Sequence, residues 1–266
     1  MRTVRWPLMT SRSSWVTPQC LNSTTPVSSR LAGRCRTTLA RVDLAKPHLD
    51  IGLYCAEITA SRAFYEDVLG LPYEELLKAG GGIHQHRLGL LGAVLKLNAS
   101  RDPLPSGLPT CLRGLTIASK GIEEPVEFVD PDGTPVTLTP FGRDVDTVEV
   151  RWASRSPGRL GELLALGLHA RPVGADRWRV GSTVLQLVED PRAEHAGGRG
   201  CGFRYLTVQV RDVVAEHIRL CQLGWGEAAA PVRLGDVAAI SFVRDPDGTV
   251  LEVSQRASLT GPLPDH

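Results

Sequence analysis

The tetrapeptide Asp-Pro-Asp-Gly occurs twice in this chain, at residues 130–133 and 245–248, each time shortly after a Phe-Val pair and before a short apolar run. A tight turn repeated in the same strand context indicates that the chain is built from duplicated modules. When the strands are aligned on these two turns, equivalent positions of each copy fall into one register. The duplication therefore restricts the fold and also selects candidate site positions.

The first copy predicts a strand, a helix and three further strands. Alternating apolar residues mark the first strand: Leu49, Ile51 and Leu53. A stripe at helical spacing follows, made of Ala60, Phe64 and Val68, and Gly70 and Pro72 supply the stop. Residues 73–77, 82–87 and 92–98 are then expected as strands. The predicted unit is βαβββ.

Three more copies follow the same order. The second, around Leu115, has only residues 120–125 before its next strand, which leaves no room for an ordinary helix. The third starts at Thr147, and the fourth starts at Tyr205 with a helix capped by Asp212. We therefore predict an α+β fold of tandem βαβββ repeats with a degraded second repeat. The repeats form two modules, 47–140 and 144–255, joined around Arg143 and followed by a tail at 256–266.

Residues 1–46 differ in composition and are expected to be a disordered leader. Arginine, serine and threonine are frequent there, and no acidic residue precedes Asp43. Such a composition cannot build a core. An organelle transit peptide and a mis-started leader both fit it, so the predicted location is cytoplasmic, or organellar if the leader is a transit peptide.

The remaining composition favours a small-molecule ligand. A formal net charge of +1 gives no reason to expect nucleic acid or an anionic membrane as a partner, and no apolar stretch is long enough for a membrane span. The six cysteines are scattered without a CxxC pair, as expected for reduced thiols. A monomer and a homodimer are both compatible with the sequence.

The helix end at residues 64–71, Phe-Tyr-Glu-Asp-Val-Leu-Gly-Leu, the two Asp-Pro-Asp-Gly turns and the fourfold repeat order together resemble the vicinal oxygen chelate superfamily. This is the group of glyoxalases, bleomycin-resistance proteins and extradiol dioxygenases. The resemblance covers residues 47–255. It implies curved sheets whose concave faces hold a divalent metal, with ligands from the first and last strands of the repeats.

The resemblance assigns two positions per repeat to the site. The first-strand positions are His48, Gly114, Thr147 and Tyr205, and the last-strand positions are Lys96, Thr137, Gln186 and Glu252. Only His48 and Glu252 are standard metal ligands, and Gln186 is a weaker oxygen donor. If the first repeat pairs with the fourth, one cup contains His48, Lys96, Tyr205 and Glu252. If each module pairs with itself, these residues divide between two cups.

These residues favour proton transfer over metal capture, because a lysine beside a site repels a dication. His48 is expected to be a base or a metal ligand, and Glu252 its acidic partner or a second ligand. Tyr205 would donate a hydrogen bond to developing negative charge. Lys96 or Arg87 would anchor an anionic substrate, and Gln186 is a further substrate-binding candidate. A divalent metal and the absence of any metal both remain open.

A second candidate is the His-x-His sequence of His84 and His86, because alternate residues on a strand point to one face. If that face is concave, His48 would complete a three-histidine metal site. The competing interpretation is a polar strand face on which Arg87 binds an anionic substrate.

The leading functional prediction is an enzyme acting on a small oxygenated metabolite by isomerase, epimerase or lyase chemistry, with or without metal assistance. The alternative is a metal-free protein that binds and sequesters a small molecule, as bleomycin-resistance proteins do. A ring-cleaving dioxygenase is the third possibility.

Overall fold

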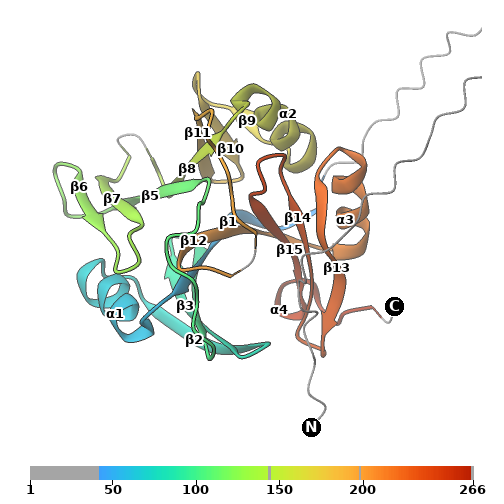
Figure 1. Cartoon of the computed structure of the whole chain (residues 1–266), viewed down its shortest axis with the longest axis horizontal. Coiled ribbons are helices and arrows are strands. Elements are labelled where there is room, and N and C mark those ends of the chain that lie inside the picture. Colours follow the sequence, from blue (N-terminus) through green and yellow to red (C-terminus); the bar gives the residue numbers. More distant parts are fainter. Residues whose placement is uncertain (1–41, 143–144, 198, 265–266) are drawn as a thin grey trace, which may run out of the picture.

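The computed structural model describes residues 42–142, 145–197 and 199–264. Two curved sheets lie side by side with the helices at the periphery (Figure 1). The predicted α+β class with two curved mixed sheets is confirmed. No helix among the described residues is long and apolar enough to cross a membrane.

The larger sheet has eight strands in the order β13-β14-β15-β12-β1-β4-β3-β2. Its strands are β1 (Leu44–Cys55), β2 (Tyr73–Gly80), β3 (Ile83–Leu90), β4 (Ala93–Ser100), β12 (Gly202–Val210), β13 (Gly226–Leu234), β14 (Ala238–Arg244) and β15 (Val250–Arg256). It thus combines the first repeat with the fourth, joined by the antiparallel pair β1 and β12. Strand β1 begins three residues before the predicted start at Pro47.

The smaller sheet has seven strands in the order β6-β7-β5-β8-β11-β10-β9. They are β5 (Leu112–Ser119), β6 (Val126–Val129), β7 (Pro135–Pro140), β8 (Val148–Ser154), β9 (Arg171–Pro172), β10 (Arg177–Val180) and β11 (Thr183–Glu189). The second and third repeats form it through the antiparallel pair β5 and β8. Each sheet therefore takes one repeat from each predicted module; the predicted junction at Arg143 and residues 1–41 of the leader lie outside the described residues.

The helices are α1 (Ile58–Arg62), the π-helical turn η1 (Ala63–Val68), α2 (Pro157–Leu168), α3 (Val213–Gln222) and α4 (Ala257–Thr260). No helix lies between β5 and β6, as predicted for the degraded repeat. Asp212 caps α3, because its Oδ1 accepts a 2.9 Å hydrogen bond from the amide of Ala215.

The predicted apolar stripe of the first helix is displaced. In the first helix Ser61 and Tyr65 are buried, while Ala60 and Val68 are exposed. Two changes explain this: the helix continues as a π-helical turn, which shifts its inward face, and Tyr65 finds a buried acceptor in Asp130 at 2.9 Å.

In helix α3, Glu216 and His217 are buried while Ile218 is exposed. Glu216 pairs with Arg219 at 2.7 Å, and His217 pairs with Glu227 at 2.9 Å. Because Glu216 and the Nε2 of His217 have polar partners, the helix can turn this face inward.

The two Asp-Pro-Asp-Gly turns are built alike. Asp130 accepts hydrogen bonds from the amides of Asp132 and Thr134, and Asp245 does the same for Asp247 and Thr249. The second aspartate of each turn reaches a neighbouring repeat: Asp132 accepts from the amide of Ala56, and Asp247 from the amide of Arg155. The turns therefore tie repeats one to two and three to four, whereas the sheets pair one with four and two with three.

Candidate functional site

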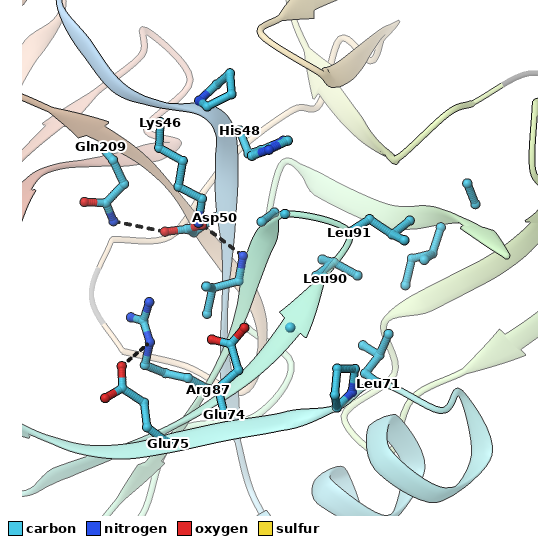
Figure 2. A pocket seen from close by; sticks show the side chains of 18 of the residues that line it. Lys46, His48, Asp50, Leu71, Glu74, Glu75, Arg87, Leu90, Leu91 and Gln209 are labelled. Atoms are coloured by element: carbon cyan, nitrogen blue, oxygen red, sulfur yellow. Dashed lines mark hydrogen bonds and ion pairs between the residues drawn. The ribbon is translucent and has the colours of Figure 1, made fainter. Parts of the chain in front are cut away.

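A cavity of about 840 Å³ opens at the end of the larger sheet, where the start of β1 meets the turn between β3 and β4 (Figure 2). One wall is polar and carries Lys46, His48, Asp50, Glu74, Glu75, Arg87, Gln209 and Arg256. The other is apolar and carries Leu69, Leu71, Leu90, Leu91, Ile117 and Leu138. Its size and mixed lining are those of a small-molecule site.

Asp50 lies at the floor of the polar wall and is completely buried. Its carboxylate accepts hydrogen bonds from Lys46 Nζ at 2.7 Å, the Val94 amide at 2.9 Å and Gln209 Nε2 at 3.0 Å. Burial by itself would raise the pKa of Asp50, but the charges of Lys96 and Lys46 outweigh it and lower the pKa below its ordinary value. Asp50 is therefore a buried carboxylate that stays ionised.

Behind the cavity floor, Lys96 and Glu252 form a buried ion pair across the concave face. Lys96 Nζ lies 3.2 and 3.1 Å from the two carboxylate oxygens of Glu252 and 2.7 Å from Thr207 Oγ1. Strands β1 and β12 stand between β4 and β15, so two side chains can meet over them only on a common, inward-curving face. Burial lowers the pKa of Lys96, while the carboxylates of Glu252 and Asp50 oppose this by favouring the ammonium form.

Tyr205 completes this group from β12. Its ring lies flat over Gly52, and its hydroxyl accepts hydrogen bonds from Asn98 Nδ2 at 3.0 Å and Gln85 Nε2 at 3.5 Å. Burial, followed by the charge of Glu252, raises the pKa of Tyr205 well above its ordinary value. The phenol is therefore neutral. Tyr205 is not among the residues that line the cavity.

The cross-strand register reveals which residues are equivalent in the first and fourth repeats. Four pairs define it: Gly52 with Tyr205, Asp50 with Thr207, Gly52 with Lys96, and Thr207 with Glu252. When the first repeat is superimposed on the fourth in this register, Lys96 is therefore equivalent to Glu252, and Asp50 is equivalent to Tyr205. The alignment made from the sequence equated His48 with Tyr205, which is wrong by two residues.

The sequence missed Asp50 because the alternating run of β1 starts earlier than that of β12. Strand β1 begins at Leu44 and carries a register shift between Leu44 and Leu49. The prediction took the residue directly before the first alternating apolar residue, Leu49, and therefore selected His48. A pairing of Ile51 with Leu206, as the structure has it, would have selected Asp50.

His48 lines the cavity but does not contact the Lys96–Glu252 pair. Its Nδ1 is hydrogen-bonded to the hydroxyl of Ser182, which belongs to the turn before β11 in the other sheet. Burial, followed by the charge of Lys46, lowers the pKa of His48. The imidazole is thus neutral near pH 7 and is oriented by Ser182.

The remaining candidates divide between faces and sheets. Arg87 and Gln85 pair with Lys96 and Asn98, so they share the concave face. His84 and His86 consequently point to the opposite face, where the ring of His86 lies 6.1 Å from that of Tyr73. The three-histidine site does not form, because the parity of β3 separates these histidines from His48.

Gln186 also lies apart from the other candidates. It belongs to β11 of the smaller sheet, where its Nε2 donates a 3.0 Å hydrogen bond to Asp176 Oδ2. The larger sheet thus brings together Lys96, Tyr205 and Glu252, with His48 and Arg87 on the adjoining cavity wall.

A divalent metal does not fit the central positions. Among the described residues, no three His, Cys, Asp or Glu side chains are grouped so that they could hold a metal ion. The four equivalent positions carry Asp50, Lys96, Tyr205 and Glu252, and the ammonium of Lys96 already occupies both oxygens of Glu252. A dication placed there would be repelled by the resident cation.

Comparisons with known proteins agree with this architecture. The model of the Glyoxalase/Bleomycin resistance protein/Dioxygenase superfamily matches residues 166–253. No curated protein sequence matches the chain.

Two solved structures illustrate the likeness in fold. Glyoxalase I from Zea mays is 14% identical, with 78% of this chain and 92% of that chain covered and a TM-score of 0.63. A candidate dioxygenase from Bacillus subtilis is 16% identical, with 82% and 86% covered and a TM-score of 0.61. The family model therefore covers residues 166–253, and the two solved structures show that the chain shares their fold.

Proposed function

We propose that this protein binds a small organic molecule in the cavity beside β1 without a divalent metal, and that the Lys96 ammonium takes the metal's place at the centre of the cup. The observation that carries the proposal is the contact of Lys96 Nζ with both oxygens of Glu252 and with Thr207. A lysine in this place supplies a positive charge between Glu252 and the buried Asp50. It leaves no coordination position open to a ligand.

The distribution of hydrogen bonds also supports binding rather than chemistry at the centre. Glu252 accepts from Lys96 and Thr207, and Asp50 accepts from three donors. Carboxylates satisfied in this way are poor proton acceptors, because proton uptake would break their existing bonds. The cavity itself offers enough volume for a drug-sized molecule and an apolar wall to receive it.

Metal analysis of the purified protein tests this proposal. We expect no stoichiometric divalent metal in the wild type. The Lys96→Glu variant, which groups three carboxylates, should gain a Mn²⁺ site detectable by calorimetry. Lys120→Glu makes the same charge change at the cavity rim and should gain none. A wild-type protein that carries one equivalent of metal and loses it on Glu252→Gln substitution would refute the proposal.

A metal-independent isomerase, epimerase or lyase is the second candidate, and His48 favours it. The imidazole is neutral, lies in the cavity wall and is oriented through Nδ1 by Ser182, which leaves Nε2 as the nitrogen for proton abstraction. Arg87, on the same wall, would anchor a substrate anion. Ring cleavage has less support, since no two histidines and a carboxylate are grouped among the described residues.

Deuterium incorporation separates the two candidates. Small carboxylates that bind the protein are incubated with it in D₂O and followed by NMR. Simple binding predicts no exchange of their carbon-bound hydrogens. Enolate chemistry predicts exchange that His48→Ala abolishes while binding persists.

A further inference from the structure

The open edge of the curled sheet is bridged by one ion pair. Arg256 Nη2 on β15 lies 3.5 Å from Glu75 Oε1 on β2. These strands are five intervals apart in the sheet order, which in a flat sheet would separate them by about 24 Å at ~4.8 Å per strand. The curl of the sheet therefore brings Arg256 to the opposite edge, beside the cavity.

A second arginine reaches the same oxygen. Arg87 Nε lies 3.1 Å from Glu75 Oε1, so two guanidinium groups converge on one carboxylate oxygen. The arginine side chains are only 7% and 13% exposed, while that of Glu75 is 45% exposed. Burial, and then the charge of Arg87, lowers the pKa of Arg256. Two buried like charges this close require an anion between them.

Glu75 satisfies this requirement imperfectly. Arg87 Nε is buried and has no hydrogen bond of good geometry among the described residues, although its charge contact with Glu75 is short. Gln209 Oε1, on the same cavity wall, is also buried without a donor in the described part of the chain. Gln209 is only 1% exposed and Arg87 only 6% exposed. The wall thus has a buried donor, on Arg87, and a buried acceptor, on Gln209, that both need partners.

Glu75 is also placed where it can move. It lies on β2, the exposed edge strand, and the ladder between β2 and β3 shifts register between Tyr73 and Glu75. Edge strands with broken ladders open at low cost. Swinging the Glu75 side chain into solvent would free both guanidinium groups without disturbing the buried centre.

We propose that Arg87 and Arg256 form a carboxylate-binding subsite of the cavity, which Glu75 fills as an internal substitute when no ligand is bound. The expected ligand is a small organic carboxylate with an apolar body for the leucine-lined wall and a hydrogen-bond donor for Gln209 Oε1. A carboxylate suits the site better than a phosphate, because Glu75 already shows the fit and the nearby Glu74 and Asp50 disfavour a dianion.

This inference rests on the proposed small-molecule function, and its test is independent of metal content. Benzoate serves as the probe, benzamide as its neutral isostere and phenyl phosphate as the phosphate probe, each titrated by NMR against the full chain. Glu75→Gln should tighten benzoate binding by about tenfold, the gain expected if Glu75 occupies the arginines roughly nine-tenths of the time. Benzamide binding should not change.

Glu74→Gln is the matched control. Glu74 lines the same cavity but is not the residue that contacts the arginines, so this variant should bind benzoate as the wild type does. Adding Arg256→Gln to Glu75→Gln should remove the gain. Glu75→Ala also removes the carboxylate from Arg87 and Arg256 and is a second test of the subsite. Thermal unfolding confirms that each variant is folded.

The proposal fails if Glu75→Gln and Glu75→Ala bind benzoate no more tightly than the wild type or show no saturable binding in the millimolar range. It also fails if phenyl phosphate gains more than benzoate. Either result would leave the metal-free assignment standing, since that depends on Lys96 and is judged by metal analysis.

Discussion

The ring of Tyr205 lies directly over Gly52 on the neighbouring strand, closer to the position of a Cβ atom at residue 52 than real Cβ contacts allow. Glycine is therefore required here by close approach. The phenol keeps its place in the hydrogen-bonded group with Asn98 only because the β1 backbone leaves it that space.

Gly52→Ala should accordingly destabilise the protein by about 1–3 kcal/mol, the usual cost of overpacking a filled site. Gly158→Ala is the control, because no atom lies near its Cβ position in α2 and alanine favours helix by up to ~1 kcal/mol. Urea unfolding followed by circular dichroism measures both. Equal stability of the two variants would contradict the close packing of Tyr205.

Lys96→Met should cost about 3–5 kcal/mol, because it leaves the Glu252 carboxylate buried without its cation. The double variant Lys96→Met, Glu252→Met should recover most of this loss, since a buried ion pair exchanged for apolar side chains is often neutral. Denaturant unfolding of the single and double variants gives the comparison. A double variant less stable than Lys96→Met would show that the pair contributes more than mutual neutralisation.

Asp245 predicts a pH dependence of stability. Burial raises the pKa of Asp245 from 3.8 to about 6, and its Oδ2 has no hydrogen-bond partner among the described residues. The folded state thus binds more protons than the unfolded state between these values. Stability from this group is fully present below pH 4 and is lost as the pH rises through 6.

Asp245→Asn retains the Oδ1 acceptor for the amides of Asp247 and Thr249 and removes the ionisation. The stability of this variant relative to wild type should rise with pH between about 4 and 6, by at most ~1.4 kcal/mol per pH unit. Unfolding at a series of pH values checks it. A difference that is independent of pH would contradict the raised pKa.

The two inter-repeat contacts should differ in strength. Asp247 accepts from Ser154 Oγ at 2.6 Å and from both the amide and the Nε of Arg155, whereas Asp132 accepts from the Ala56 amide at 3.0 Å and from Ser61 at 3.5 Å. Asp247→Ala should therefore destabilise the protein more than Asp132→Ala. The Asp132→Ala variant should lose about 0.5–2 kcal/mol of the free energy of unfolding, as for other capping residues. Thermal unfolding of both variants ranks them, and the reverse order would refute the comparison.

The sequence predicted the repeat units well because local physics decides them. The alternation of Leu49, Ile51 and Leu53 marks a strand with one buried face, and Asp212 marks a helix start. The inward face of the first helix was displaced because Tyr65 is buried with a polar partner from another element, and α3 likewise buries His217 against Glu227. Hydrophobic periodicity carries no information about such partners.

By itself, the sequence determined the strand and helix order, the turn structure of both Asp-Pro-Asp-Gly segments and the presence of Lys96 where a metal ligand was expected. Only the tertiary structure decided that the first repeat pairs with the fourth and that Asp50 rather than His48 is the counterpart of Tyr205. It also decided that Arg256 contacts Glu75 across the open edge of the curled sheet. Side-chain alternation is a property of one strand, but register and curl depend on pairing between strands more than a hundred residues apart. That pairing is set by the packing of whole sheets, which no single segment encodes.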